Sequence, residues 1–106
     1  MIEEKIVELL AGFPVHLTPA PAGTEPPYLT YQVISEMPQD TIGGTAETLV
    51  NIQLNSYALT LYDAKRIAKN AVNALSPLKP YQINYMQDYD SDARLHGVIV
   101  EFYVFN

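Results

Sequence analysis

Apolar residues recur at helical spacing in two segments of the chain, residues 2–13 and 60–75. In the first segment, the apolar stripe consists of Ile2, Ile6, Leu9, Leu10 and Phe13. In the second, it consists of Ala64, Ile67, Ala68, Ala71, Val72 and Leu75. Spacings of three and four residues place such side chains on one face of a helix. Thr60 followed by Asp63 predicts the N-cap of the second helix, and Pro77 predicts its end.

Apolar and polar residues alternate in four other segments, which are residues 28–36, 49–57, 81–88 and 95–105. A period of two residues is typical of strands with one buried face. In the second of these segments, an uncharged polar ladder alternates with apolar side chains, and it consists of Asn51, Gln53 and Asn55. The element order is therefore α-β-β-α-β-β. We expect an α+β fold in which two helices pack on one face of a four-stranded, mostly antiparallel sheet.

Two connecting segments have unusual compositions. Residues 14–27 contain five of the eight prolines, and because proline has no N–H to donate, we expect a Pro-rich surface connector that does not pair in the sheet. Residues 37–48 predict a hairpin loop longer than the roughly two to five residues that are usual. Long loops of this kind either order on a partner or remain simply flexible, and both interpretations fit the composition.

These segments supply the candidate contact residues of the chain. The loop has few charges and two glycines, and the polar ladder offers amides to water or to a neighbouring subunit. We therefore predict contacts with a partner or with a second copy of the chain from Met37, Asp40, Thr41, Ile42, Gly43, Gly44, Asn51, Gln53 and Asn55.

The composition indicates one globular domain spanning residues 1–106. A chain of 106 residues can bury a core of its own, and 48% hydrophobic residues exclude a wholly disordered chain. The absence of cysteine excludes a disulfide scaffold, a thiolate metal site and a cysteine nucleophile. We expect no secretory signal, because residues 2–10 are acidic and amphipathic with no basic flank or small-residue cleavage site. We expect no membrane span, because no apolar run approaches about 18 residues.

Charge is distributed unevenly along the chain, whose formal net charge is −6. Residues 1–53 hold one base, Lys5, and seven acids, whereas residues 54–106 hold five bases and five acids. Because nucleic-acid binding depends on Lys and Arg that neutralise phosphates, we do not expect tight binding of DNA or RNA. The same charge balance argues against docking on anionic membranes.

Candidate chemistry is sparse. Asp88, Asp90 and Asp92 alternate like the beginning of a calcium loop, but the sixth and twelfth places hold Ala93 and Ile99 instead of Gly and Glu. A solvated turn is the favoured interpretation, and a weak divalent-cation site is the alternative. The two histidines, His16 and His96, lie in no catalytic motif. We therefore expect no catalytic residue, no cofactor and no enzymatic activity.

Local sequences along nearly the whole chain point to a known family. They are the segment PPYLTYQVISEMP, the glycine-bearing loop after it, the strand TLVNIQLNSYA, the helix LYDAKRIAKNAVNAL and the final strand GVIVEFYVF. In these features the chain resembles the small tail-terminator, or tail-completion, minor tail proteins of long-tailed bacteriophages and prophages. The resemblance implies an α+β sandwich and a structural role. The implied assembly is a homohexameric ring that caps the head-proximal end of the tail tube, stops tube polymerisation and joins the tail to the head.

The resemblance also implies partners and a location. The partners are other copies of the chain, the tail tube protein and the head-side connector protein, with DNA only passing through the lumen. The location is the virion tail, after assembly in the host cytoplasm. Two alternatives remain open, namely another phage neck or minor capsid component, and a small α+β ligand-binding or enzymatic domain, because fold alone does not determine function.

Overall fold

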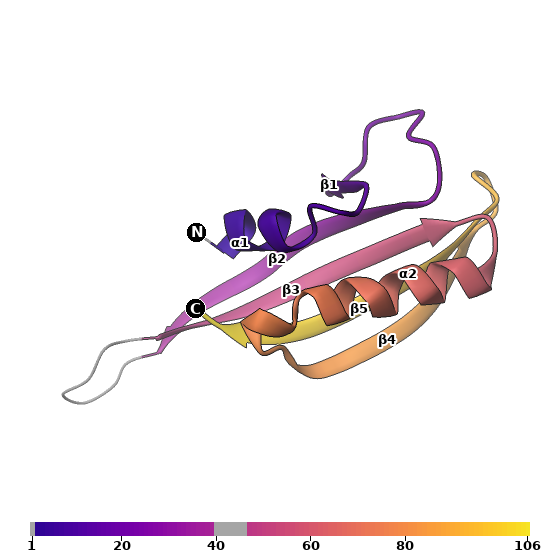
Figure 1. Cartoon of the computed structure of the whole chain (residues 1–106). Helices are drawn as coiled ribbons and strands as arrows, with labels where there is room; N and C mark the ends of the chain where they lie inside the picture. The colour runs from indigo at the N-terminus through magenta and orange to yellow at the C-terminus, as the bar shows by residue number, and fades with distance from the viewer. Residues whose placement is uncertain (1, 40–46) are drawn as a thin grey trace.

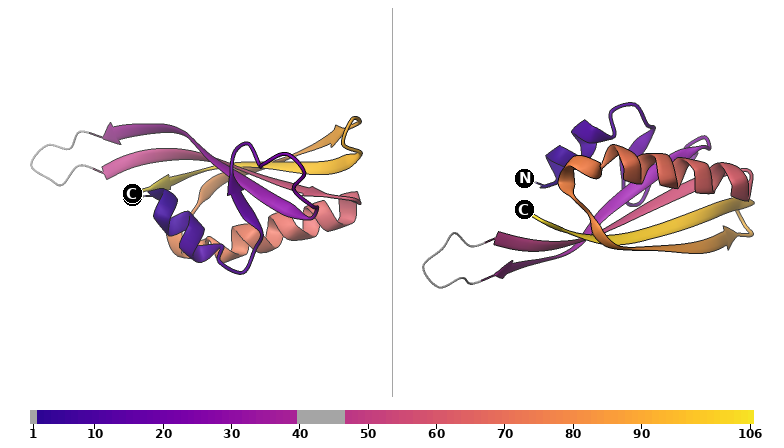
Figure 2. Two further views of the ribbon diagram at one scale, coloured as in Figure 1. Left: turned by 90° about the horizontal axis from the view of Figure 1, so that it is seen from above. Right: turned by 60° about the horizontal axis from the view of Figure 1, so that its bottom comes forward.

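The computed structural model describes residues 2–39 and 47–106. The elements are α1 (Ile2–Leu9), β1 (Val15–Leu17), β2 (Tyr28–Gln39), β3 (Glu47–Ala58), α2 (Leu61–Ala74), the 3-10 turn η1 (Ser76–Leu78), β4 (Tyr81–Asp90) and β5 (Leu95–Phe105). The strands form one sheet in the order β1-β2-β3-β5-β4 (Figure 1). β1 is parallel to β2, and the other neighbouring strands are antiparallel. Both helices lie on the same side of the sheet (Figure 2).

A single hydrophobic core joins the helices to the sheet. The central strands β3 and β5 present their apolar alternation to the helices, and the helical stripes predicted from the sequence face them. The fully buried members include Ile2, Ile6, Leu10, Val50, Ile52, Leu54, Ala64, Ala68, Ala71, Val100, Phe102 and Val104. The two periods seen in the sequence, about 3.6 and 2 residues, therefore mark the two sides of one interface.

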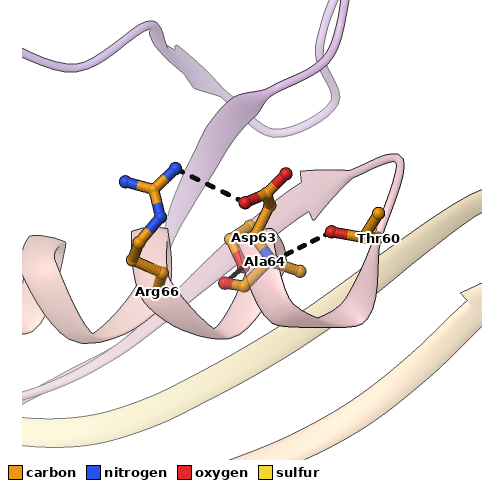
Figure 3. Close-up of polar contacts among 5 residues, drawn as sticks. Thr60, Asp63, Ala64 and Arg66 are labelled. Carbon is orange, nitrogen blue, oxygen red and sulfur yellow. Dashed lines mark hydrogen bonds and ion pairs between the residues drawn. The ribbon is translucent and has the colours of Figure 1, made fainter.

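The N-terminus of α2 confirms the predicted cap (Figure 3). The Thr60 hydroxyl oxygen accepts a hydrogen bond from the Asp63 N–H at 3.1 Å. The Asp63 carboxylate forms an ion pair with Arg66 at 3.6 Å, so it does not complete the second half of a capping box. The buried Ser56 hydroxyl donates to the Ala64 carbonyl at 2.7 Å and ties the first turn of the helix to β3.

The predicted four-stranded sheet is wrong by one strand, because the sheet has five strands and is mixed. Val15–Leu17, inside the Pro-rich connector 14–27, pairs with Leu29–Tyr31. The three residues of β1 are not prolines, so their N–H groups are available for the sheet. Hydrogen bonds from Leu29 N to Pro14 O at 2.8 Å and from Thr18 N to Tyr31 O at 3.0 Å extend the contact.

The predicted loop 37–48 is also too long at both ends. Met37, Pro38 and Gln39 belong to β2 and pair with Leu49, Thr48 and Glu47 of β3. A proline is tolerated here because this part of β2 lies at an edge of the described sheet, where one side of the strand needs no partner. Asp40, Thr41, Ile42, Gly43 and Gly44 lie outside the described residues.

Truncation of Leu54 tests the core. Leu54 is 0% exposed, so Leu54→Ala is expected to lower the free energy of unfolding by about 2–5 kcal/mol. Urea denaturation followed by circular dichroism measures the change. Leu59→Ala is the matched control, because Leu59 is 69% exposed and its truncation is expected to change the free energy by less than about 0.5 kcal/mol. Equal losses in the two variants would contradict the packing.

Removal of the α2 cap tests the local structure. Thr60→Ala leaves the Asp63 N–H without its acceptor and is expected to lower the free energy of unfolding by about 1 kcal/mol. Thr60→Ser retains the oxygen and serves as the control. If the alanine and serine variants unfold at the same urea concentration, the hydroxyl does not stabilise the helix.

Candidate functional site

The sheet face without helices is the candidate functional surface. The strand registers place side chains in rows across this face from β2 through β3 and β5 to β4. One row consists of Thr30, Asn55, Ile99 and Met86. The next row consists of Gln32, Gln53, Glu101 and Asn84. The surface therefore has a polar centre. This follows from β3, in which polar side chains on this face alternate with core side chains on the other face.

Amide side chains at this centre form hydrogen bonds along β3 and to the neighbouring strands. The Asn55 amide donates to the Thr30 hydroxyl at 3.2 Å, and the Gln53 amide donates to the Asn55 carbonyl oxygen at 3.1 Å. The Asn51 amide donates to the Glu101 carboxylate at 3.0 Å. The buried Asn51 Oδ1 atom has no hydrogen-bond partner among the described residues. An unpaired buried acceptor carries a desolvation cost that a donor from a bound partner would remove.

Aromatic pairs lie at both ends of the polar centre. At one end, the rings of Tyr28 and Tyr57 are 5.1 Å apart between centroids. At the other end, the Tyr81 ring is 6.0 Å from Tyr103 and stacks 5.8 Å from Phe105. Tyrosine is common at protein interfaces because it combines a rigid apolar ring with one hydrogen-bonding group.

Basic residues are missing from the long strands. β2, β3, β4 and β5 contain no Lys or Arg, and all six bases of the chain lie elsewhere in the sequence. The acids of the face include Glu101, Asp88 and Asp90. This surface therefore offers uncharged amides, hydroxyls, phenols and carboxylates. None of the four long strands supplies a Lys or Arg with which to hold a phosphate.

The environment of this face raises the pKa values of two tyrosines, Tyr28 and Tyr57. Burial raises the pKa of Tyr57 above its ordinary value of 10.0, and the nearby Tyr28, Asp88 and Asp90 raise it further. Burial and the Asp90 carboxylate raise the pKa of Tyr28 in the same direction. On the helix side of β4, burial raises the pKa of Tyr85. All three phenols are therefore neutral at physiological pH.

The structure exposes some of the predicted contact residues and buries others that the sequence predicted to be exposed. Met37 is exposed at the end of β2, and Gln53 is half-buried. Asn51 and Asn55, expected on an exposed ladder, are only 8% and 5% exposed, because neighbouring strands flank β3 on both sides. The aromatic pairs were not predicted as contact residues. The period of two places Tyr57 with Asn55 on the same face and could have identified it.

The aspartates of the β4–β5 hairpin have local partners. Asp88 and Asp90 lie at the end of β4 and point to the helix-free face, and Asp92 follows in the turn. The Asp90 carboxylate accepts hydrogen bonds from Asp92 N at 3.0 Å and Ala93 N at 3.1 Å, as turn aspartates commonly do. Within residues 2–39 and 47–106, no group of three or more His, Asp or Glu side chains is arranged to hold a metal ion.

The histidines lie near aromatic rings. The His96 ring is 4.8 Å from that of Tyr89, and the His16 ring is 6.3 Å from that of Tyr28. No hydrogen bond among the described residues links either histidine to a carboxylate or hydroxyl partner of the kind that general-base catalysis uses. In the same part of the chain, no helix is long and apolar enough to cross a membrane.

The two helices backing a sheet with one open face define the class of small α+β sandwiches. Comparison with protein families identifies the particular group. The family model of Tail completion protein gp17 matches residues 4–105, so the chain belongs to this family of phage tail proteins. The match confirms the resemblance inferred from the sequence. A search of curated proteins finds no match. The family is one of structural phage tail proteins, so at this level the chain is a component of the virion.

Substitution of Asp90 tests the electrostatics of the face. Asp90→Asn retains the carbonyl oxygen that the turn uses and removes the charge, so the pKa values of Tyr28 and Tyr57 are expected to fall. Phenolate absorbance during an alkaline titration measures the change, and Tyr57→Phe identifies the Tyr57 contribution. Asp92→Asn is the control. Unchanged titration in Asp90→Asn would show that this carboxylate does not influence the phenols.

The same titration has a consequence for stability. Because the native pKa values of Tyr28 and Tyr57 are raised, the native chain holds these protons more tightly than the unfolded chain. The free energy of unfolding is therefore expected to fall as pH rises above about 10 and through the native pKa values.

Proposed function

We propose that copies of this chain form a ring, with six subunits as the expected number, that caps the head-proximal end of a phage tail tube. The ring stops tube polymerisation and joins the tail to the head-side connector. Its partners are other copies of the chain, the tail tube protein and the connector protein. Membership of the tail-completion family supports this function over nearly the whole chain.

The observation that carries the proposal is the base-free sheet face. A conduit for DNA must let phosphates slide past, and Lys or Arg on its wall would hold them. The helix-free face offers amides, phenols and carboxylates and no base from β2 to β5. We therefore assign this face to the lumen and the helices to the outside of the ring.

The dimensions of the subunit are compatible with such a ring. The Cα atoms span 52 × 22 × 22 Å, so the chain is elongated along its strands. In a six-membered ring of upright subunits, the central hole is about as wide as one subunit, or about 22 Å between Cα surfaces. That width is close to the diameter of a DNA duplex.

Two other functions have less support. Another neck or minor capsid role would use the same fold with a different contact surface. A ligand-binding domain would need a cavity with converging polar groups. The described chain has a depression of about 610 Å³ beside the connector, lined mostly by small residues and prolines together with Glu25, Tyr28, Leu59, Ala93 and Leu95. The Thr24 hydroxyl there already donates to the Pro21 carbonyl, which leaves Glu25 and Tyr28 as the remaining polar side chains of the depression.

Deletion of the gene in the phage or prophage that encodes the chain tests the proposed function. We expect tails of uncontrolled length that carry no heads, because the tube then lacks its terminator. Electron microscopy measures the length distribution. The Leu59→Ala chain supplied in trans is the control and is expected to restore tails of uniform length, because Leu59 is exposed and outside the core.

Different outcomes separate the alternatives. Tails of normal length without heads would replace tube termination with a neck function. Tails of normal length joined to heads would remove the proposal altogether.

A further inference from the structure

The two lateral edges of the sheet differ in charge on their helix side. α1 lies toward β2, and α2 lies over β3 and β5, toward β4 (Figure 1; Figure 2, right). We call β4 with Lys65 and Lys69 of α2 the basic edge. We call β2 with Glu36 and with Glu4 and Glu8 of α1 the acidic edge.

The basic edge combines free backbone, apolar side chains and unpaired cations. Every β4 residue from Gln82 to Asp90 is exposed, and no described strand pairs with the outer side of β4. Lys65 and Lys69 line a hollow of about 200 Å³ together with Tyr85 and Gln87 of β4. The Lys69 ammonium lies 5.1 Å from the centre of the Tyr85 ring, and neither lysine has an ion pair among the described residues.

Apart from the register shift near its start and the charges of Asp88 and Asp90, β4 has little that protects an edge strand. Its irregular register ends at Asn84, and the regular part to Asp90 contains no lysine and no proline. Natural proteins usually protect such an edge with lysine, proline or a bulge. Asp88 and Asp90 project to the helix-free face and so leave the helix side of this edge without a carboxylate from β4.

The acidic edge has the complementary charge. β1 covers only Leu29–Tyr31, and no described strand pairs with the outer side of β2 beyond Tyr31. Glu36 pairs directly with the buried Val50, so its exposed side chain belongs to the helix side of β2. Glu4 and Glu8 are exposed on α1, and neither forms an ion pair within the described part of the chain.

We propose that the basic edge of one copy binds the acidic edge of the next copy, with Lys65 and Lys69 facing Glu36 and the exposed glutamates of α1. This inference rests on the proposed ring and names the contact that closes it. Two different surfaces that bind each other produce a head-to-tail interface, which closes into a ring when the rotation between copies allows it. Exposed apolar side chains on both edges, Ile34 and Met37 of β2 and Ile83 and Met86 of β4, become buried in the contact.

Strand directions are compatible with this contact. β2, β3, β5 and β4 alternate in direction, so β4 of one copy runs antiparallel to β2 of a neighbour related by rotation about the ring axis. The bulge between Val33 and Ser35, together with Pro38, prevents a long regular ladder on β2. Side-chain contacts and ion pairs therefore supply most of the specificity.

Charge reversal on each edge tests the contact. Lys65→Glu with Lys69→Glu gives a chain with two acidic edges, and Glu8→Lys with Glu36→Lys gives a chain with two basic edges. Each variant alone is expected to need a concentration about 100-fold or more above that of the wild type to assemble, because like charges then face each other. Light scattering and sedimentation measure the mass against 11.8 kDa for one copy.

Restored assembly is the decisive result. An equimolar mixture of the two variants is expected to assemble, because acidic and basic edges alternate around the ring. A chain carrying all four substitutions is expected to assemble by itself. Recovery in the mixture also shows that both variants are folded. The matched controls are Arg94→Glu and Glu25→Lys, which change the charge in the hairpin turn and the connector and are expected to assemble like the wild type.

Three results would overturn the inference: assembly of both charge-reversed variants at wild-type concentration, a mixture that assembles no better than its components, or a wild-type chain that is monomeric over the whole concentration range. None of these decides the proposed function, which the tail phenotype of the deletion tests independently.

Discussion

The pairing of β3 with two neighbours is the constraint on which the rest of the structure depends. β3 lies between β2 and β5 and alternates between apolar and amide side chains from Val50 to Asn55. Val50, Ile52 and Leu54 join the helices to the sheet, and Asn51, Gln53 and Asn55 form the polar centre of the opposite face. A slip of one residue would bury the amides against the helices and expose the core residues, so burial fixes the register.

Incomplete coverage of the sheet creates the interaction surfaces. α2 covers β3 and β5, and the strand outside them, β4, is exposed along nearly its whole length. Ser56 fastens α2 to β3 through the Ala64 carbonyl, which holds the lysines of α2 beside β4. The same packing that stabilises the core therefore leaves one basic edge, one acidic edge and one base-free face. In the proposed ring, the two edges contact the two neighbouring copies and the base-free face lines the lumen.

Much of the fold follows from local sequence. Thr60 caps α2, and the alternation of β5 places Val100, Phe102 and Val104 in the core, because a helix cap and a period of two depend only on residues close in sequence. β1 was not predicted, since five prolines surround it and, among the described strands, it pairs with β2 alone. The ends of β2 and β3 were not predicted either, because Pro38 and the glycines beyond it suggested a loop. For the face itself, the ladder of amides was identified, but the aromatic pairs at its ends were not.

The sequence by itself determined the two helices, the four long strands, the family and the absence of bases from those strands. Each of these depends on periodicity, composition or local sequence motifs. Only the tertiary structure decided that β5 inserts between β3 and β4, that Asn51 and Asn55 are buried, and that Lys65 and Lys69 lie beside Tyr85. These features depend on pairing between residues far apart in the chain. Such pairing is selected by burial of the whole core, and no short stretch of sequence contains enough information to specify it.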